Sequence, residues 1–229
     1  MRKLSVKTTF HERLWGWIYL ALQVLVLPIL LAVANIMFGL YLSDAELNFV
    51  FFAINFTVVT VIFHRFILEN AKIALRDPVG VLLKGIAGFV LYIVLSNIVT
   101  FIINEINPNH YNVNDDFIST MVADDYTLMI IGTVLLVPIT EELLYRGLIF
   151  ASLYNRSRVL AYIVSTLAFA ALHVYTYIGT YPPEQLLLCL LQYLPAGICL
   201  GWAYAKTDSI WTPVLIHMTV NTIAVSAMR

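Results

Sequence analysis

The chain has 229 residues, of which 61% are hydrophobic and 12% charged, and its formal net charge is −1. Soluble domains contain about 45–50% apolar and about 25% charged residues, so this chain carries more apolar side chains than one core of its size can bury in water. The composition excludes a disordered chain, and the lack of a basic surplus excludes a nucleic-acid-binding protein. It predicts a membrane protein.

Seven apolar runs are long enough to be read as membrane-spanning helices, which need about 20 residues each. They are Leu14–Leu42, Leu47–Leu68, Val79–Ile103, Leu128–Tyr154, Val159–Tyr177, Gln185–Tyr204 and Ile210–Met228. The first run resembles a signal peptide, but its length favours an uncleaved helix. The predicted fold is an all-α, polytopic transmembrane bundle of about seven spans. Cys189 and Cys199 would lie about 15 Å apart on one helix, too far for a disulfide.

Basic and acidic connections alternate along the chain. The basic residues precede the first span or lie in the second, fourth and sixth connections: Arg2, Lys3, Lys7, Arg13, Arg65, Lys72, Arg76, Lys84, Arg156, Arg158 and Lys206. The longest of the other connections, Asn104–Thr127, contains five acidic residues and no Lys or Arg. The positive-inside rule therefore predicts an integral membrane protein with a cytoplasmic amino terminus and an extracytoplasmic acidic loop.

Three charged residues interrupt the fourth predicted span. Glu141, Glu142 and Arg146 would lie near the middle of the bilayer, where each charge costs about 3 kcal/mol. Glu142 and Arg146 are four residues apart and can form an ion pair, whereas Glu141 is turned about 100° away from that helix face. We expect Glu142 to be structural, Glu141 to be functional, and Pro138 to open the helix locally.

Two later spans carry polar residues at comparable depth. His173 lies near the middle of the fifth span, four residues after Phe169, whose expected role is packing. His217 and Asn221 lie four residues apart on one face of the seventh span. We expect these groups to converge with Glu141, because intramembrane ionisable residues face the bundle interior.

The motifs Glu141-Glu142-x-x-x-Arg146, Phe169-x-x-x-His173 and His217-x-x-x-Asn221 resemble, in order and spacing, those of a known family. This is the CAAX protease and bacteriocin-processing (CPBP, or Abi) family of intramembrane endopeptidases. The resemblance covers roughly the last 100 residues. It implies two parts: residues 1–126, with three transmembrane helices and the acidic extracytoplasmic loop, and residues 127–229, a four-helix catalytic core.

The resemblance also implies a mechanism that needs no cofactor. Glu141 and His173 would activate a water for attack on a peptide carbonyl, and His217 and Asn221 would form the oxyanion site. The site would be shaped by Glu142, Arg146 and Phe169. The substrate would be a membrane-bound or amphipathic peptide in a bacterial cell membrane. Maturation of a bacteriocin or secreted peptide, or self-immunity, fits the compact chain better than prenyl processing.

Three alternatives stay open. Glu141, His173 and His217 would also suit zinc with an open water position, which would make the chain a zinc-dependent protease. A non-catalytic membrane scaffold or immunity protein would retain the fold and bind a partner. A proton-coupled transporter would use the buried Glu and His residues as a relay, but transporters usually contain internal repeats, and the sequence shows none.

Overall fold

The computed structural model describes residues 3–229, so Arg2, one of the residues behind the predicted topology, lies outside the described residues. The described residues form helices and contain no strand. One isolated β-bridge joins Ile178 and Tyr181. The helices are α1 (Phe10–Leu25), α2 (Leu27–Met37), α3 (Asp44–Ile62), α4 (His64–Arg76), α5 (Pro78–Ile106), α6 (Val113–Asp124), α7 (Tyr126–Ile130), η1 (Ile131–Leu136), α8 (Val137–Glu142), η2 (Leu143–Phe150), α9 (Ala151–Tyr154), α10 (Arg158–Leu172), η3 (Tyr175–Tyr177), α11 (Pro183–Thr207) and α12 (Trp211–Ala227).

Several of these helices are long and apolar enough to cross a membrane. They are α3, α5, the continuous helix Tyr126–Tyr154 and α11, and the bent pair α1–α2 adds a fifth candidate. α10 and α12 coincide with the other two predicted spans, but with 15 and 17 residues they are shorter than the usual 20. The structure is thus all-α with four or five candidate spans among the described residues.

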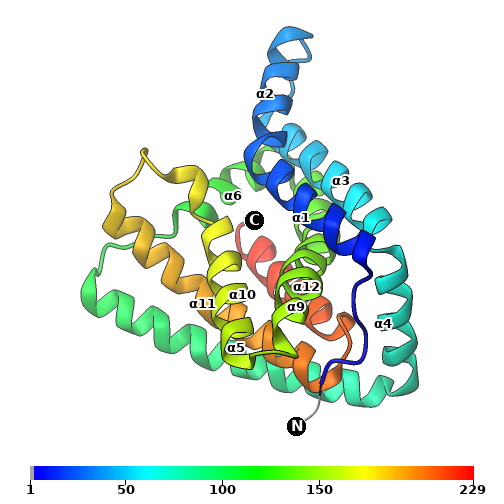
Figure 1. Ribbon diagram of the computed structural model, residues 1–229. Helices are drawn as coiled ribbons and strands as arrows, with labels where there is room; N and C mark the ends of the chain where they lie inside the picture. Colours follow the sequence, from blue (N-terminus) through cyan, green and yellow to red (C-terminus); the bar gives the residue numbers. More distant parts are fainter. Residues whose placement is uncertain (1–2) are drawn as a thin grey trace.

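The predicted first span, Leu14–Leu42, is broken. α1 and α2 meet at an angle of 50°, and α2 projects at the top of the view (Figure 1). Pro28 explains the break, because it has no N–H to donate to the carbonyl four residues earlier, on Val24. That carbonyl instead accepts a hydrogen bond of 3.2 Å from the Tyr175 hydroxyl.

Two other predicted boundaries differ from the structure. The predicted second span, Leu47–Leu68, ends earlier, at Ile62, and α4 continues as a separate helix rich in charged residues. The acidic connection Asn104–Thr127 contains α6. Asn112 starts this helix, because its side-chain oxygen accepts hydrogen bonds from the backbone N–H groups of Asn114 and Asp115. Cys189 and Cys199 are both free, as predicted from their separation.

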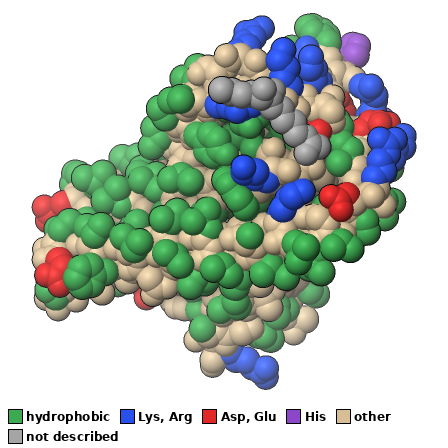
Figure 2. Space-filling view, turned by 90° about the horizontal axis from the view of Figure 1, so that it is seen from below, with side chains coloured by type: hydrophobic (Ala, Val, Ile, Leu, Met, Phe, Trp, Pro, Cys, Tyr) green, Lys and Arg blue, Asp and Glu red, His purple; other side chains and the backbone are tan. Residues whose placement is uncertain are grey.

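The largest hydrophobic core surrounds η2, all of whose residues are buried. Its other members include Leu4, Phe66, Tyr154 and Ile210, which border the connections that carry Lys and Arg. In Figure 2 most of the visible Lys and Arg side chains gather at one end of the molecule, beside a broad hydrophobic surface. The largest hydrophobic core therefore extends to the basic end of the bundle.

Close packing between α10 and α11 depends on Gly197. A Cβ atom at this position would lie 2.6 Å from Thr166 Cγ2 and 2.9 Å from the Thr166 Cα. We predict that Gly197→Ala destabilises the protein by about 1–3 kcal/mol despite the better helix propensity of alanine. Thermal unfolding in detergent measures the effect. Gly85→Ala is the matched control, because its Cβ would be 3.8 Å from Thr212 and should be tolerated.

Candidate active site

The two glutamates lie on a helix whose hydrogen-bond register is disturbed on both sides. Between Tyr126 and Tyr154 the helix is continuous, but η1 and η2 have π-helical hydrogen bonding, and α8, which carries Glu141 and Glu142, lies between them. In η1 the N–H of Val137 donates to the carbonyl of Gly132, five residues earlier. The next residue, Pro138, has no N–H, so the carbonyl of Thr133 receives no donor in this register.

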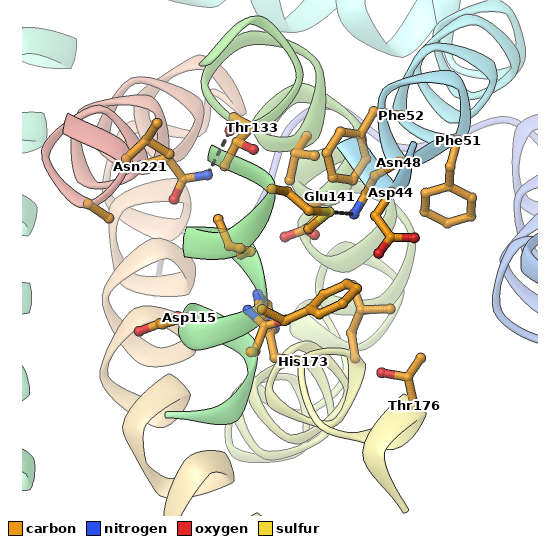
Figure 3. Close-up of a pocket in the computed structure, with 18 of the residues that line it drawn as sticks. Asp44, Asn48, Phe51, Phe52, Asp115, Thr133, Glu141, His173, Thr176 and Asn221 are labelled. Atoms are coloured by element: carbon orange, nitrogen blue, oxygen red, sulfur yellow. Dashed lines mark hydrogen bonds between the residues drawn. The ribbon is translucent and has the colours of Figure 1, made fainter. Parts of the chain in front are cut away.

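Asn221 supplies the donor that the Thr133 carbonyl lacks within its own helix. Its side-chain Nδ2 donates to the Thr133 carbonyl at 2.8 Å (Figure 3). The interaction fixes α12 against η1 at the depth of the glutamates. One amide hydrogen and the amide oxygen of Asn221 are not used by this bond and are available to a ligand.

The carboxylate of Glu142 contacts two side chains in the interior, Arg146 and His217. Its Oε1 accepts a hydrogen bond from Arg146 Nη1 at 3.0 Å, and His217 Nδ1 lies 3.1 Å from the same oxygen. The side chains of Glu142 and Arg146 are completely buried, and Arg146 Nη2 also donates to the carbonyl of Gly197 at 3.4 Å. The predicted ion pair is present, and the link to His217 is an additional role for Glu142 that its spacing did not reveal.

Glu141 has a different environment from its neighbour. Its side chain is 14% exposed, and its Oε2 is buried without a hydrogen-bond partner among the described residues. His217 Nε2 lies 3.9 Å from this oxygen. His217 is therefore placed between the two carboxylates, with Nδ1 toward Glu142 and Nε2 toward Glu141. Because Nδ1 faces a carboxylate oxygen it carries a hydrogen, and Nε2 is the atom available for chemistry.

His173 lies at the end of α10 with its ring fixed on both sides. Its Nδ1 is 2.9 Å from the carbonyl of Phe169, which can only accept, so Nδ1 carries a hydrogen and Nε2 is left with the lone pair in the neutral ring. The Phe169 ring contacts His173 and His217 at centroid distances of 4.9 and 5.8 Å. Arg146 lies over the same ring at 4.4 Å. Phe169 thus packs between the charged cluster and both histidines, as expected for a residue that shapes the site.

Tyr193 is a site residue that the sequence analysis missed. Its ring stacks on His173 with centroids 4.0 Å apart. Its hydroxyl donates to Asp115 at 3.0 Å and to Asn112 at 3.2 Å, two alternative acceptors, and accepts from Asn114 at 3.0 Å. No sequence motif marks this residue, because its importance comes from the contact between α11 and the start of α6.

The predicted catalytic residues meet at one cavity of about 510 Å³. Glu141, His173, His217 and Asn221 all line it, as do Asp44 of α3 and Asp115 of α6, which lie on opposite sides in Figure 3. Leu31 of α2 and Phe51 and Phe52 of α3 are among its apolar walls. Both predicted parts of the chain, residues 1–126 and 127–229, therefore contribute to the site.

The alternative zinc ligands, Glu141, His173 and His217, line the same cavity. Within residues 3–229, no group of three His, Cys, Asp or Glu side chains is clustered as metal ligands would be. Glu141 and His217 approach each other to 3.9 Å, and the Nδ1 of His173 is bound to a backbone carbonyl, which leaves its Nε2 free. In this conformation the three residues do not form a ligand set, and binding of a metal would require them to move.

The buried pair gives a prediction about stability. We expect Glu142→Ala to destabilise the protein by about 3–5 kcal/mol, because Arg146 would remain buried without its partner. Glu141→Gln should leave stability nearly unchanged, since Glu141 Oε2 accepts no hydrogen bond from the described residues. Thermal unfolding of the purified variants in detergent measures both effects. Equal stability of the two variants would contradict the structural role of Glu142.

The sequence of the chain is similar to those of known proteins. Residues 123–223 match the family described as type II CAAX prenyl endopeptidase Rce1-like. The chain is 28% identical over 176 residues, 73% of its length, to "Putative membrane peptidase YdiL" of Bacillus subtilis (strain 168). It is 32% identical over 95 residues, 42% of its length, to "UPF0177 protein YxdF" of Lactococcus lactis subsp. lactis (strain IL1403).

These matches cover only part of each relative. The aligned region spans 65% of the Bacillus protein and 47% of the Lactococcus protein, less than two thirds of either. No solved structure matches the chain. The matched family region contains all three motifs and every side chain that the sequence predicts for the site. Residues 123–223 are therefore similar to the type II CAAX prenyl endopeptidase Rce1-like family over the part of the chain that carries the predicted site.

Proposed function

We propose that this protein is an intramembrane endopeptidase that hydrolyses a peptide bond with a water activated by Glu141 and His173. The observation that carries the proposal is the unequal environment of the two neighbouring glutamates. Glu142 is engaged by Arg146 and His217, whereas Glu141 lines a cavity together with two histidines and an amide. A carboxylate without a structural partner beside imidazole rings suits general-base catalysis.

In the proposed mechanism each residue has one task. Glu141 accepts a proton from the attacking water, and His173, through its free Nε2, takes part in moving that proton to the leaving amine. With hydrogens on both ring nitrogens, His217 donates from its Nε2–H, and together with the unused amide hydrogen of Asn221 it stabilises the negative charge that develops on the carbonyl oxygen. Glu142 holds His217 through Nδ1, while Arg146 and Phe169 keep Glu142 and both rings in place.

We propose that the protein crosses a bacterial cell membrane seven times with its amino terminus in the cytoplasm. The alternation of basic and acidic connections supports this orientation. α10 and α12 would be the two short spans, and residues 127–229 would be the catalytic core. The substrate we propose is a membrane-bound or amphipathic peptide, in the maturation of a bacteriocin or secreted peptide or in self-immunity.

The central prediction concerns Glu141. Glu141→Gln should abolish processing while expression and thermal stability stay nearly unchanged, because the amide cannot accept the proton from water. Mass spectrometry of the peptides secreted or retained by cells carrying wild type or Glu141→Gln measures this. Glu69→Gln, an exposed glutamate on α4 paired with Lys72, is the matched control and should behave as wild type. Normal processing by Glu141→Gln would disprove the assigned base.

A separate assay with purified protein distinguishes the metal-free mechanism from the zinc alternative. Purified wild-type protein should retain its proteolytic activity in a strong chelator. Complete loss of activity that added zinc restores would overturn the metal-free mechanism and assign Glu141, His173 and His217 as ligands.

A second prediction concerns Tyr193 as a positioning residue for His173. Tyr193→Leu removes the ring that stacks on His173 and should lower kcat by about 10–100-fold with little change in KM. Tyr193→Phe keeps the ring but loses the hydroxyl contacts with Asp115 and Asn114, and it should have a smaller effect. Exposed Tyr111→Phe is the control. A loss of thermal stability without a change in kcat would show that Tyr193 only packs.

A further inference from the structure

The cavity opens toward one end of the bundle. The lining residues of α3 and α11 come from the half of each helix that adjoins an acidic connection, and Glu141 and His217 lie near the middle of their helices. α3 and α6 contribute their first residues, Asp44 and Asp115, and α12 contributes its last turn up to Met228. The helix that starts at Tyr126 lines the cavity as far as Glu141. This residue lies 15 residues, or about 22 Å, along the helix. Thr176, in the connection after α10, lies at the rim and is exposed (Figure 3).

The opposite end of the bundle is closed. Immediately after Glu142, η2 is buried in the largest hydrophobic core, and Arg146 fills the space behind the glutamates. The Lys and Arg residues of the connections lie beyond this core (Figure 2). A peptide arriving from the basic face would have to displace packed aromatic side chains, whereas the acidic face leads directly into the cavity.

The charges on the cavity wall indicate which peptide it accepts. Besides Glu141, the wall carries the carboxylates of Asp44 and Asp115, and none of the described residues that line it is Lys or Arg. A free peptide carboxyl terminus would therefore meet acidic groups and no cation to pair with it. An apolar segment with Lys or Arg at its outer end would match both the apolar walls and the two carboxylates at the rim.

From these observations, and resting on the endopeptidase function proposed above, we propose that the site is loaded from the extracytoplasmic face. Its substrate is an internal apolar peptide segment whose outer end carries basic residues, with Asp44 as a residue that determines specificity. The enzyme would then act on exported or membrane-anchored peptides rather than on carboxyl termini presented in the cytoplasm.

The access direction can be tested without any catalytic activity. Thr176→Cys should react with a membrane-impermeant maleimide in intact spheroplasts, and Lys206→Cys should react only in inverted vesicles. Native Cys189 and Cys199 are buried and give a low background. Labelling of Thr176→Cys only in inverted vesicles would overturn the proposed direction of access.

The charge preference is tested by protection of the same cysteine. The probe is an amidated peptide with a Leu/Ala centre and three Lys or three Glu at its outer end, added to Thr176→Cys in the Glu141→Gln background so that cleavage cannot occur. The Lys peptide should protect at about fivefold lower concentration than the Glu peptide at low salt, and salt should reduce this difference. Asp44→Asn should reduce the preference, whereas the control Asp116→Asn, which does not line the cavity, should retain it.

Equal protection by the two peptides, protection by neither, or preference for the Glu peptide would each overturn the proposed specificity. These results do not depend on turnover. A failure of the peptidase function, seen as unchanged processing in cells that lack the protein, is therefore distinguishable from a failure of the substrate assignment.

Discussion

A completely buried arginine is the constraint on which the rest of this structure depends. An unpaired guanidinium in the interior of an apolar bundle would be far too costly, so Arg146 requires a carboxylate, and Glu142 provides it from the preceding turn. The pair in turn fixes His217 through Nδ1 and supports the Phe169 ring between the two histidines. Charges that cannot leave the interior thus hold the neighbouring catalytic candidates in position.

The site also depends on a missing hydrogen-bond donor. Pro138 leaves the Thr133 carbonyl without a partner, and Asn221 of another helix supplies one. The same pattern occurs at Pro28, where the Tyr175 hydroxyl donates to the carbonyl of Val24. In both places a proline creates an acceptor inside the membrane region and a distant side chain satisfies it, so local breaks in helices become contacts between helices.

Much of the site could be predicted from the sequence because its residues follow helical spacing. The Glu142–Arg146 pair, the separate position of Glu141 and the similarity to the family all follow from helical intervals of four residues and from the cost of burying charge. The hydrogen bonds of the Tyr193 hydroxyl and the link between Glu142 and His217 could not be predicted, because they join residues about 75 to 80 positions apart. The break at Pro28 and the helix α6 are local, but hydropathy alone does not show them.

The π-helical segment η1 has a geometric consequence for the two glutamates. A π turn holds one residue more than an α turn, so η1 offsets the rotational position of everything that follows it. Without that extra residue α8 would be rotated by about 100°, which is the angle between adjacent side chains on a helix. The inserted residue therefore sets which member of the Glu141–Glu142 pair faces the cavity and which faces the arginine. Deletion of one residue in η1 would turn both carboxylates to other sides of the helix, although every motif would remain intact.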